Sequence, residues 1–122
     1  HPRNLTDDMI KALAEKGGAI GVNFYPYFLK ENGIATVKDI AEHLYHMYQV
    51  GGEDVVAIGT DFDGFDEGEL NISHISQMNI VFDEVKNATN NKKGEFINFL
   101  KKRNVALLSK SILAILPISV SV

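Results

Sequence analysis

The fold class follows from one continuous apolar run, Val55-Val56-Ala57-Ile58-Gly59-Thr60, which Asp61 ends. The run lacks the alternation of apolar and polar residues that marks a strand with one face in water. We therefore expect a strand that is buried on both faces. A second run of this kind, residues 19–25, is rich in β-branched and aromatic side chains and is closed by Pro26.

Helical patterns precede and connect the two apolar runs. Thr6 is suited to cap a helix that Gly17 stops, and Thr36 is suited to cap a longer helix that runs until Gly51. Residues 26–35 read as a loop. Because the longer helix joins the two runs, we expect a βαβ unit with parallel strands and a right-handed crossover, which makes the fold class α/β.

The rest of the chain has the pattern of two more helices. Residues 73–86 carry apolar side chains at helical spacing, and residues 95–115 follow after a turn. The 122 residues allow one domain, but they are about half of the roughly 250 that an eightfold β/α barrel needs. Since the chain starts with His1 rather than Met, we expect a piece of a longer protein. We divide this single partial domain into β/α units (residues 1–86) and a helical tail (residues 87–122).

Composition and charge exclude several classes of function. The chain has no cysteine, which excludes disulfides, thiolate nucleophiles and cysteine-bound metals and allows the cytoplasmic location that we expect. Residues 51–90 carry nine acidic side chains and one basic one, which argues against a nucleic-acid interface. The basic residues of the tail fit a solvated helix face. No uninterrupted apolar run reaches the roughly 18 residues of a membrane span.

An acidic cluster follows the second apolar run directly. Five carboxylates stand within residues 61–69, where their repulsion must be offset by a cation, by hydrogen bonds or by water. A helix-loop-helix calcium site is excluded, because its sixth position needs Gly and its twelfth needs Glu, whereas the chain has Asp66 and Ile72. Two interpretations stay open: a solvated loop, or an active site in which Asp61 acts as acid, base or substrate ligand.

Three segments resemble one known family in their order and spacing. They are His1–Asp8, Gly18–Tyr25 and Ile58–Gly64. Over about residues 1–85 the chain resembles the membrane (renal) dipeptidase family of zinc peptidases. The resemblance implies that the chain is the C-terminal part of a metallo-dependent hydrolase-like (β/α)₈ TIM barrel, with its last two parallel strands and their flanking helices.

The resemblance also implies an activity and two site residues. Members of the family hydrolyse dipeptides with two bridged zinc ions, which supply hydroxide at neutral pH and polarise the peptide carbonyl. By resemblance, Arg3 binds the substrate carboxylate, a task that suits a forked guanidinium. Asp61 would contact the substrate amino group and donate a proton to the departing nitrogen, with Asp63 as a neighbour that tunes its acidity.

The resemblance assigns no zinc ligand to this chain. The family's ligands are a His-x-Asp pair early in the barrel, a bridging Glu and two later histidines, the second of them a little upstream of Arg3. His1 lies too close to Arg3 to be that ligand. His43 and His46 lie three residues apart on one helix face, a spacing that could bind a metal. In the barrel, however, this helix packs outside the strands and far from the pocket, so we expect surface positions for both, and likewise for His74 in a first helical turn. The isolated chain should therefore be inactive.

A second hypothesis is a non-catalytic binding or assembly module. Two strands alone leave open edges and uncovered apolar faces. The chain would then need the rest of a barrel, a partner chain or self-association to complete the sheet. The apolar run at residues 111–122 has no functional interpretation under either hypothesis.

Overall fold

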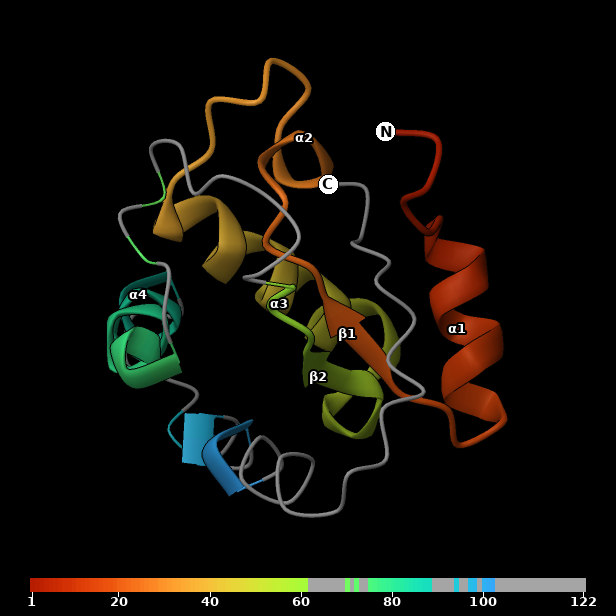
Figure 1. The fold of residues 1–122 in the computed structure, drawn as a ribbon. Coiled ribbons are helices and arrows are strands. Elements are labelled where there is room, and N and C mark those ends of the chain that lie inside the picture. Colours follow the sequence, from red (N-terminus) through yellow and green to blue (C-terminus); the bar gives the residue numbers. More distant parts are fainter. Residues whose placement is uncertain are drawn as a thin grey trace.

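The computed structural model describes residues 1–61, 70, 72, 75–88, 94, 97–98 and 100–102 (Figure 1). Its elements follow the order α1 (Asp7–Glu15), β1 (Ile20–Val22), α2 (Pro26–Leu29), α3 (Val37–Gly51), η1 (Glu53–Val55), β2 (Val56–Ile58), η3 (Ile75–Gln77) and α4 (Met78–Ala88). The elements η1 and η3 are short 3₁₀ helices.

The two strands pair in parallel, as the apolar runs predict. Ile20 lies opposite Val56, and Val22 lies opposite Ile58. The chain passes from β1 to β2 through α2 and α3, so the βαβ unit expected from the sequence is present. The α/β class, with two parallel strands and flanking helices, is confirmed.

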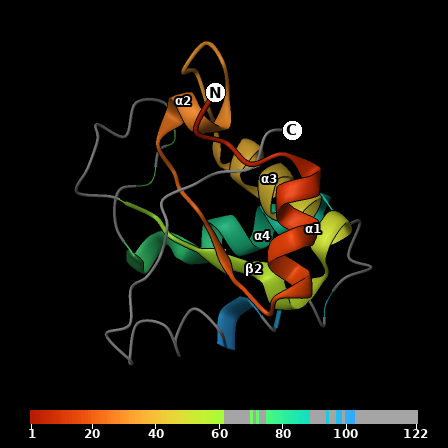
Figure 2. The ribbon, with the colours of Figure 1, turned by 90° about the vertical axis from the view of Figure 1, so that its right-hand side faces the viewer.

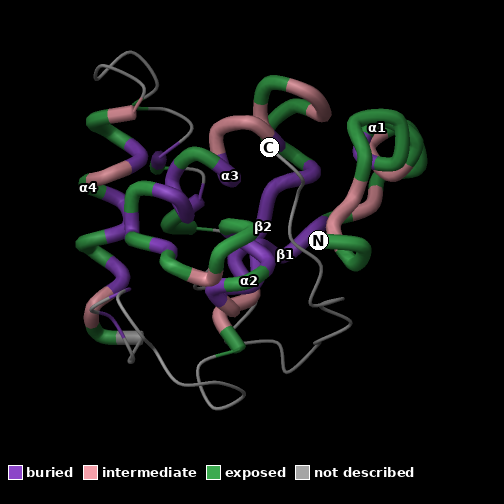
Figure 3. The backbone as a smooth tube through the Cα atoms, turned by 90° about the horizontal axis from the view of Figure 1, so that it is seen from above, coloured by how far each residue is buried: buried purple, intermediate pink, exposed green. Residues whose placement is uncertain are grey.

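The two faces of the sheet differ in side-chain size. Every residue of both strands is buried, which Figure 3 shows as a purple tube along β1 and β2. The large side chains belong to the same hydrophobic core as α3; they are Ile20, Val22, Val56 and Ile58. Gly21 lies opposite Ala57. Because side chains alternate along a strand, this small pair lies on the other face.

The central helix is α3, on which the other helices pack. Figures 1 and 3 show α1 and α4 on opposite sides of it, and both helices contact it. Its Thr36 is confirmed as the N-cap. Its buried residues are Val37, Asp39, Ile40, Ala41, His43, Leu44 and Met47. One wide face of α3 thus lies inside the molecule, in keeping with the wide apolar stripe of its sequence.

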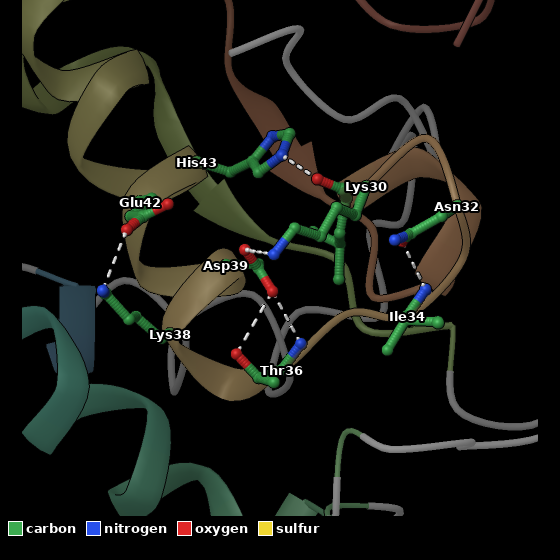
Figure 4. A network of polar contacts seen from close by, with 9 residues as sticks. Lys30, Asn32, Ile34, Thr36, Lys38, Asp39, Glu42 and His43 are labelled. Carbon is green, nitrogen blue, oxygen red and sulfur yellow. Dashed lines mark hydrogen bonds and ion pairs between the residues drawn. The ribbon is translucent and has the colours of Figure 1, made fainter.

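Asp39 fixes the start of α3 (Figure 4). Its Oδ2 accepts hydrogen bonds from the backbone N–H of Thr36 at 2.8 Å and from the Thr36 hydroxyl at 3.1 Å. Its Oδ1 lies 3.4 Å from Nζ of Lys30. The carboxylate satisfies a backbone donor at the helix start and links it to the end of α2, which orients the crossover.

The segment before α3 and the start of β2 differ from the sequence prediction. Pro26–Leu29 forms the short helix α2 where the sequence predicts a loop. Proline favours the first position of a helix because its φ is fixed and its missing N–H has no partner there anyway, but one turn is too short to show a period. Val55, predicted as the first strand residue, is instead the last residue of η1.

The third predicted helix, residues 73–86, is observed as η3 and α4, which end at Ala88. The helix predicted for residues 95–115 is confirmed near its start, where the described residues are helical; they are 94, 97–98 and 100–102. The rest of that prediction, and the apolar run at 111–122, lie outside the described residues. The division of the chain at residue 86 stays a prediction. None of the helices within the described ranges is long and apolar enough to cross a membrane.

Gly51, the last residue of α3, allows α1 to approach closely. A Cβ atom at this position would lie 2.7 Å from Cγ1 of Val55 and 3.0 Å from Cγ2 of Ile10. Ile10 is the buried residue of α1. A side chain at position 51 would therefore push α1 or η1 away from α3.

We predict that Gly51→Ala lowers the free energy of unfolding by about 1–3 kcal/mol, because overpacking outweighs the better helix propensity of alanine. The midpoint of urea unfolding measures this change. Gly94→Ala is the matched control, since Gly94 is also helical and an added Cβ there meets nothing within 4 Å. The control should be neutral or up to about 1 kcal/mol more stable. Equal shifts in the two variants would contradict the close approach.

Candidate functional site

The candidate site is the carboxyl end of the sheet, where the chain leaves both strands. Backbone pairing continues beyond the strands themselves. The N–H of Gly59 donates to the carbonyl of Val22 at 3.0 Å, and the N–H of Phe24 donates to the carbonyl of Thr60 at 3.2 Å. Since parallel strands end at the same edge, the residues that follow are neighbours, and this edge is where α/β proteins bind ligands.

Asn23 and Asp61 meet at this edge. By the alternation along each strand, both side chains fall on the face of Gly21 and Ala57, away from the large residues of the core. Asn23 is fully buried, whereas Asp61 is exposed. Nδ2 of Asn23 donates a hydrogen bond to Oδ2 of Asp61 at 3.1 Å. The two strand ends are thus joined through side chains as well as through the backbone.

The backbone of Asp61 is left-handed, with φ of 60°. Aspartate and asparagine adopt this region more readily than other residues that carry a Cβ. The chain therefore turns directly after Thr60, whose carbonyl takes part in the pairing. Asp63, predicted to tune the acidity of Asp61, lies outside the described residues.

Arg3 lies against α2, the helix that follows β1. Its guanidinium carbon is 4.9 Å from the ring centroid of Phe28, a cation–π contact. The His1 ring meets the same ring edge-on, with centroids 4.7 Å apart, and Nδ2 of Asn4 donates to the Phe28 carbonyl at 2.7 Å. Figure 2 accordingly shows the N-terminus beside α2. Arg3 is exposed, and no ion pair joins it to Asp61 within the described part of the chain.

A hollow of about 560 Å³ lies beside this N-terminal segment. Its lining includes His1, Asn4, Phe28 and His43. The hollow therefore lies between the first residues of the chain, α2 and α3, next to the residues that hold Arg3.

His43 is buried, which corrects the prediction of a surface position. Its exposed fraction is 2%, and its Nε2 lies 2.9 Å from the carbonyl of Leu29 (Figure 4). Because a carbonyl only accepts, Nε2 carries the proton in the neutral ring. Nδ1 is buried without a hydrogen-bond partner among the described residues. The sequence holds a signal for this burial, since His43 lies three residues after Ile40 and four before Met47 on the apolar stripe of α3.

His46 contacts a different neighbour, and the two histidines form no joint site. Its Nε2 lies 2.8 Å from Oδ1 of Asp7 on α1. The described residues contain no group of three or more His, Cys, Asp or Glu side chains that could hold a metal ion. His74 lies outside them.

Burial lowers the pKa of His43 below the ordinary value of 6.5, because desolvation penalises the charged ring. The bond to Leu29 and the charge of Asp39 oppose this shift. The unfolded chain takes up a proton near pH 6.5, whereas the folded chain does so only at lower pH. Neutral His43 therefore makes its full contribution to the free energy of unfolding above pH 6.5. This contribution decreases as the pH drops below 6.5, until the folded ring also protonates.

We predict that the midpoint of urea unfolding falls between pH 7.5 and pH 5.5, and that His43→Gln removes part of this fall. Glutamine retains an N–H donor for the Leu29 carbonyl and does not titrate. His46→Gln, on the same helix but partly exposed, is the control and should keep the contribution of His43. An unchanged pH dependence in His43→Gln would show that protonation of this ring does not limit stability.

Comparison with known proteins identifies the family. The family model for membrane dipeptidase (peptidase family M19) matches residues 1–109. The chain belongs to this family. The match covers all three segments that carry the resemblance, including Arg3 and Asp61, and the predicted family is confirmed.

Several relatives have similar sequences over part of their length. A Schizosaccharomyces pombe protein named Uncharacterized dipeptidase C965.12 is 38% identical over 79 residues, which are 63% of this chain and 19% of the yeast protein. A second S. pombe protein, Uncharacterized dipeptidase C3A11.10c, is 36% identical over 86 residues, 67% of this chain and 20% of that protein. A Klebsiella pneumoniae protein named Uncharacterized protein in pqqA 5′ region is 42% identical over 67 residues, which are 52% of this chain and 25% of the Klebsiella protein. The chain thus spans about a fifth to a quarter of these relatives.

Proposed function

We propose that this chain is the C-terminal part of a zinc-dependent dipeptidase and supplies the last two strands of its (β/α)₈ barrel. The family match over residues 1–109 carries the proposal. The parallel pairing of β1 and β2 and the helices packed around α3 support it. In such barrels the catalytic residues come from the carboxyl ends of several strands, and Asp61 follows the carboxyl end of β2.

The two zinc ions in this proposal are bound by residues elsewhere in the protein. The described residues gather no set of metal ligands, so they do not fit a metal site of their own. When bound, zinc supplies a hydroxide and polarises a carbonyl. This chain contributes substrate binding and proton transfer, and the isolated chain is accordingly inactive.

Arg3 binds the free carboxylate of the dipeptide in this proposal. The guanidinium carbon of Arg3 lies 4.9 Å from the centroid of the Phe28 ring, a cation–π contact that restrains the side chain. A guanidinium carries five N–H donors, and its fork matches a carboxylate. The exposure of Arg3 allows a ligand to reach it.

Asp61 contacts the substrate amino group and donates a proton to the departing nitrogen. A general acid must lie within hydrogen-bond reach of the atom that it protonates, which requires an accessible carboxyl group. Asp61 is exposed at the edge where the strands end, and its bond to Asn23 holds it there. These two features support the assignment.

For the full-length protein with zinc, we predict that Asp61→Asn lowers kcat for dipeptide hydrolysis by at least about 100-fold. Asparagine keeps the size of the side chain and tolerates the left-handed backbone, so the loss isolates the carboxyl group. Asp8→Asn is the control, because the Asp8 side chain is 96% exposed on α1, and it should retain full activity. Wild-type rates in Asp61→Asn would rule out the proton donor.

We also predict that Arg3→Ala raises KM for a dipeptide with a free C-terminal carboxylate by about 10- to 100-fold, since a charge-assisted bidentate contact is lost. The KM for a C-terminally amidated substrate should rise much less. Lys11→Ala removes another exposed cation, on α1, and serves as the control. An equal rise in KM for the free and the amidated substrate would contradict carboxylate binding.

An assembly module is the second candidate function. In the described residues the sheet has two strands, so each strand has one edge without a strand partner. A full-length protein that hydrolyses no dipeptide with zinc but forms a stable complex in size-exclusion chromatography would favour this function over the dipeptidase.

A further inference from the structure

We propose that Asn23 is a positioning residue for Asp61: its buried amide holds the exposed carboxylate in the orientation needed for proton transfer. The inference rests on the proposed function of Asp61. It assigns to the residue that follows β1 a role in the chemistry of a residue beyond the end of β2.

The hydrogen bonds determine which way the Asn23 amide faces. Its Oδ1 accepts from the backbone N–H of Tyr25 at 2.8 Å, and its Nδ2 donates to Oδ2 of Asp61 at 3.1 Å. An N–H needs an acceptor and an ionised carboxylate needs a donor, so a flipped amide would lose both bonds. The bond to Tyr25 therefore presents the amide N–H to Asp61 in a fixed direction.

The two partners differ in how firmly they are held. Asn23 is fully buried within the segment where β1 pairs with β2, and pairing continues to Phe24. Asp61 is exposed and lies just beyond that pairing, on a left-handed turn. An exposed side chain on a turn samples several rotamers, and each rotamer other than the productive one lowers the rate. The bond from the rigid partner restricts this sampling.

The bond also gives the two carboxyl oxygens of Asp61 different roles. Oδ2 accepts from the Asn23 amide. Oδ1 is then the oxygen that carries the transferable proton or meets the substrate amino group. A neutral amide can donate to Oδ2 whether or not Oδ1 is protonated, so the orientation persists through proton transfer.

The test is a kinetic double-mutant cycle in the full-length protein with zinc. Asn23→Ser is the variant of choice, because the serine hydroxyl can still accept from the backbone two residues on but is too short to reach Asp61. We expect kcat to fall by about 10- to 100-fold, the loss of one hydrogen bond to a charged group, with a smaller change in KM. In the Asp61→Asn background, Asn23→Ser should lower kcat no further, because its effect passes through the carboxylate.

Asn32→Ser is the matched control. Oδ1 of Asn32 accepts from the backbone N–H of Ile34 at 2.9 Å, the same local geometry as Asn23 and Tyr25, but on an exposed loop. It should leave kcat unchanged. Urea unfolding of each variant shows whether the fold is retained, and Asn23→Ala, which removes the donor without adding a titratable group, provides a second variant with the same expected loss.

The outcomes separate this inference from the proposed function. A wild-type kcat in folded Asn23→Ser, or an equal further loss in the Asp61→Asn background, would overturn the positioning role and leave the dipeptidase proposal intact. Full activity in Asp61→Asn would overturn the role of Asp61 and the positioning role with it.

Discussion

The parallel pairing of β1 with β2 is the interaction on which the rest of the molecule depends. The register of Ile20 with Val56 and of Val22 with Ile58 directs the large side chains of both strands into one core with α3. The same register places the small residues together on the other face and brings the two carboxyl ends side by side. The apolar core and the candidate site thereby lie on opposite faces of one small sheet.

The helix α3 converts this pairing into a packed structure. It connects the strands, lies between α1 and α4, and begins at the network of Asp39, Thr36 and Lys30 (Figure 4). The interior around it is close-packed at Gly51 and includes a neutral histidine, His43, under α2. The helix thus carries both a close approach to α1, at Gly51, and a buried titratable ring, at His43.

Local patterns predicted the elements, whereas long-range contacts could not be read from the sequence. The continuous apolar runs predicted buried strands, and Thr6 and Thr36 marked the two helix starts, because these signals depend on neighbouring residues alone. The bond from Asn23 to Asp61 joins residues 38 positions apart, so it follows only from the register. The resemblance predicted the family, which the match over residues 1–109 confirmed, while the roles of Arg3, Asp61 and zinc stay proposals because no contact in the described residues tests them.

The alternation of faces along β2 makes the length of this strand as important as its composition. Loss or gain of a single residue between Ile58 and Asp61 would turn the carboxylate toward the apolar core, while Ile58 kept its place opposite Val22. A change of two residues would restore the faces but would shift Asp61 by about 6–7 Å along the strand, out of reach of Asn23. The segment can therefore change by substitution much more readily than by insertion or deletion, and alignments of related chains should be free of gaps across it.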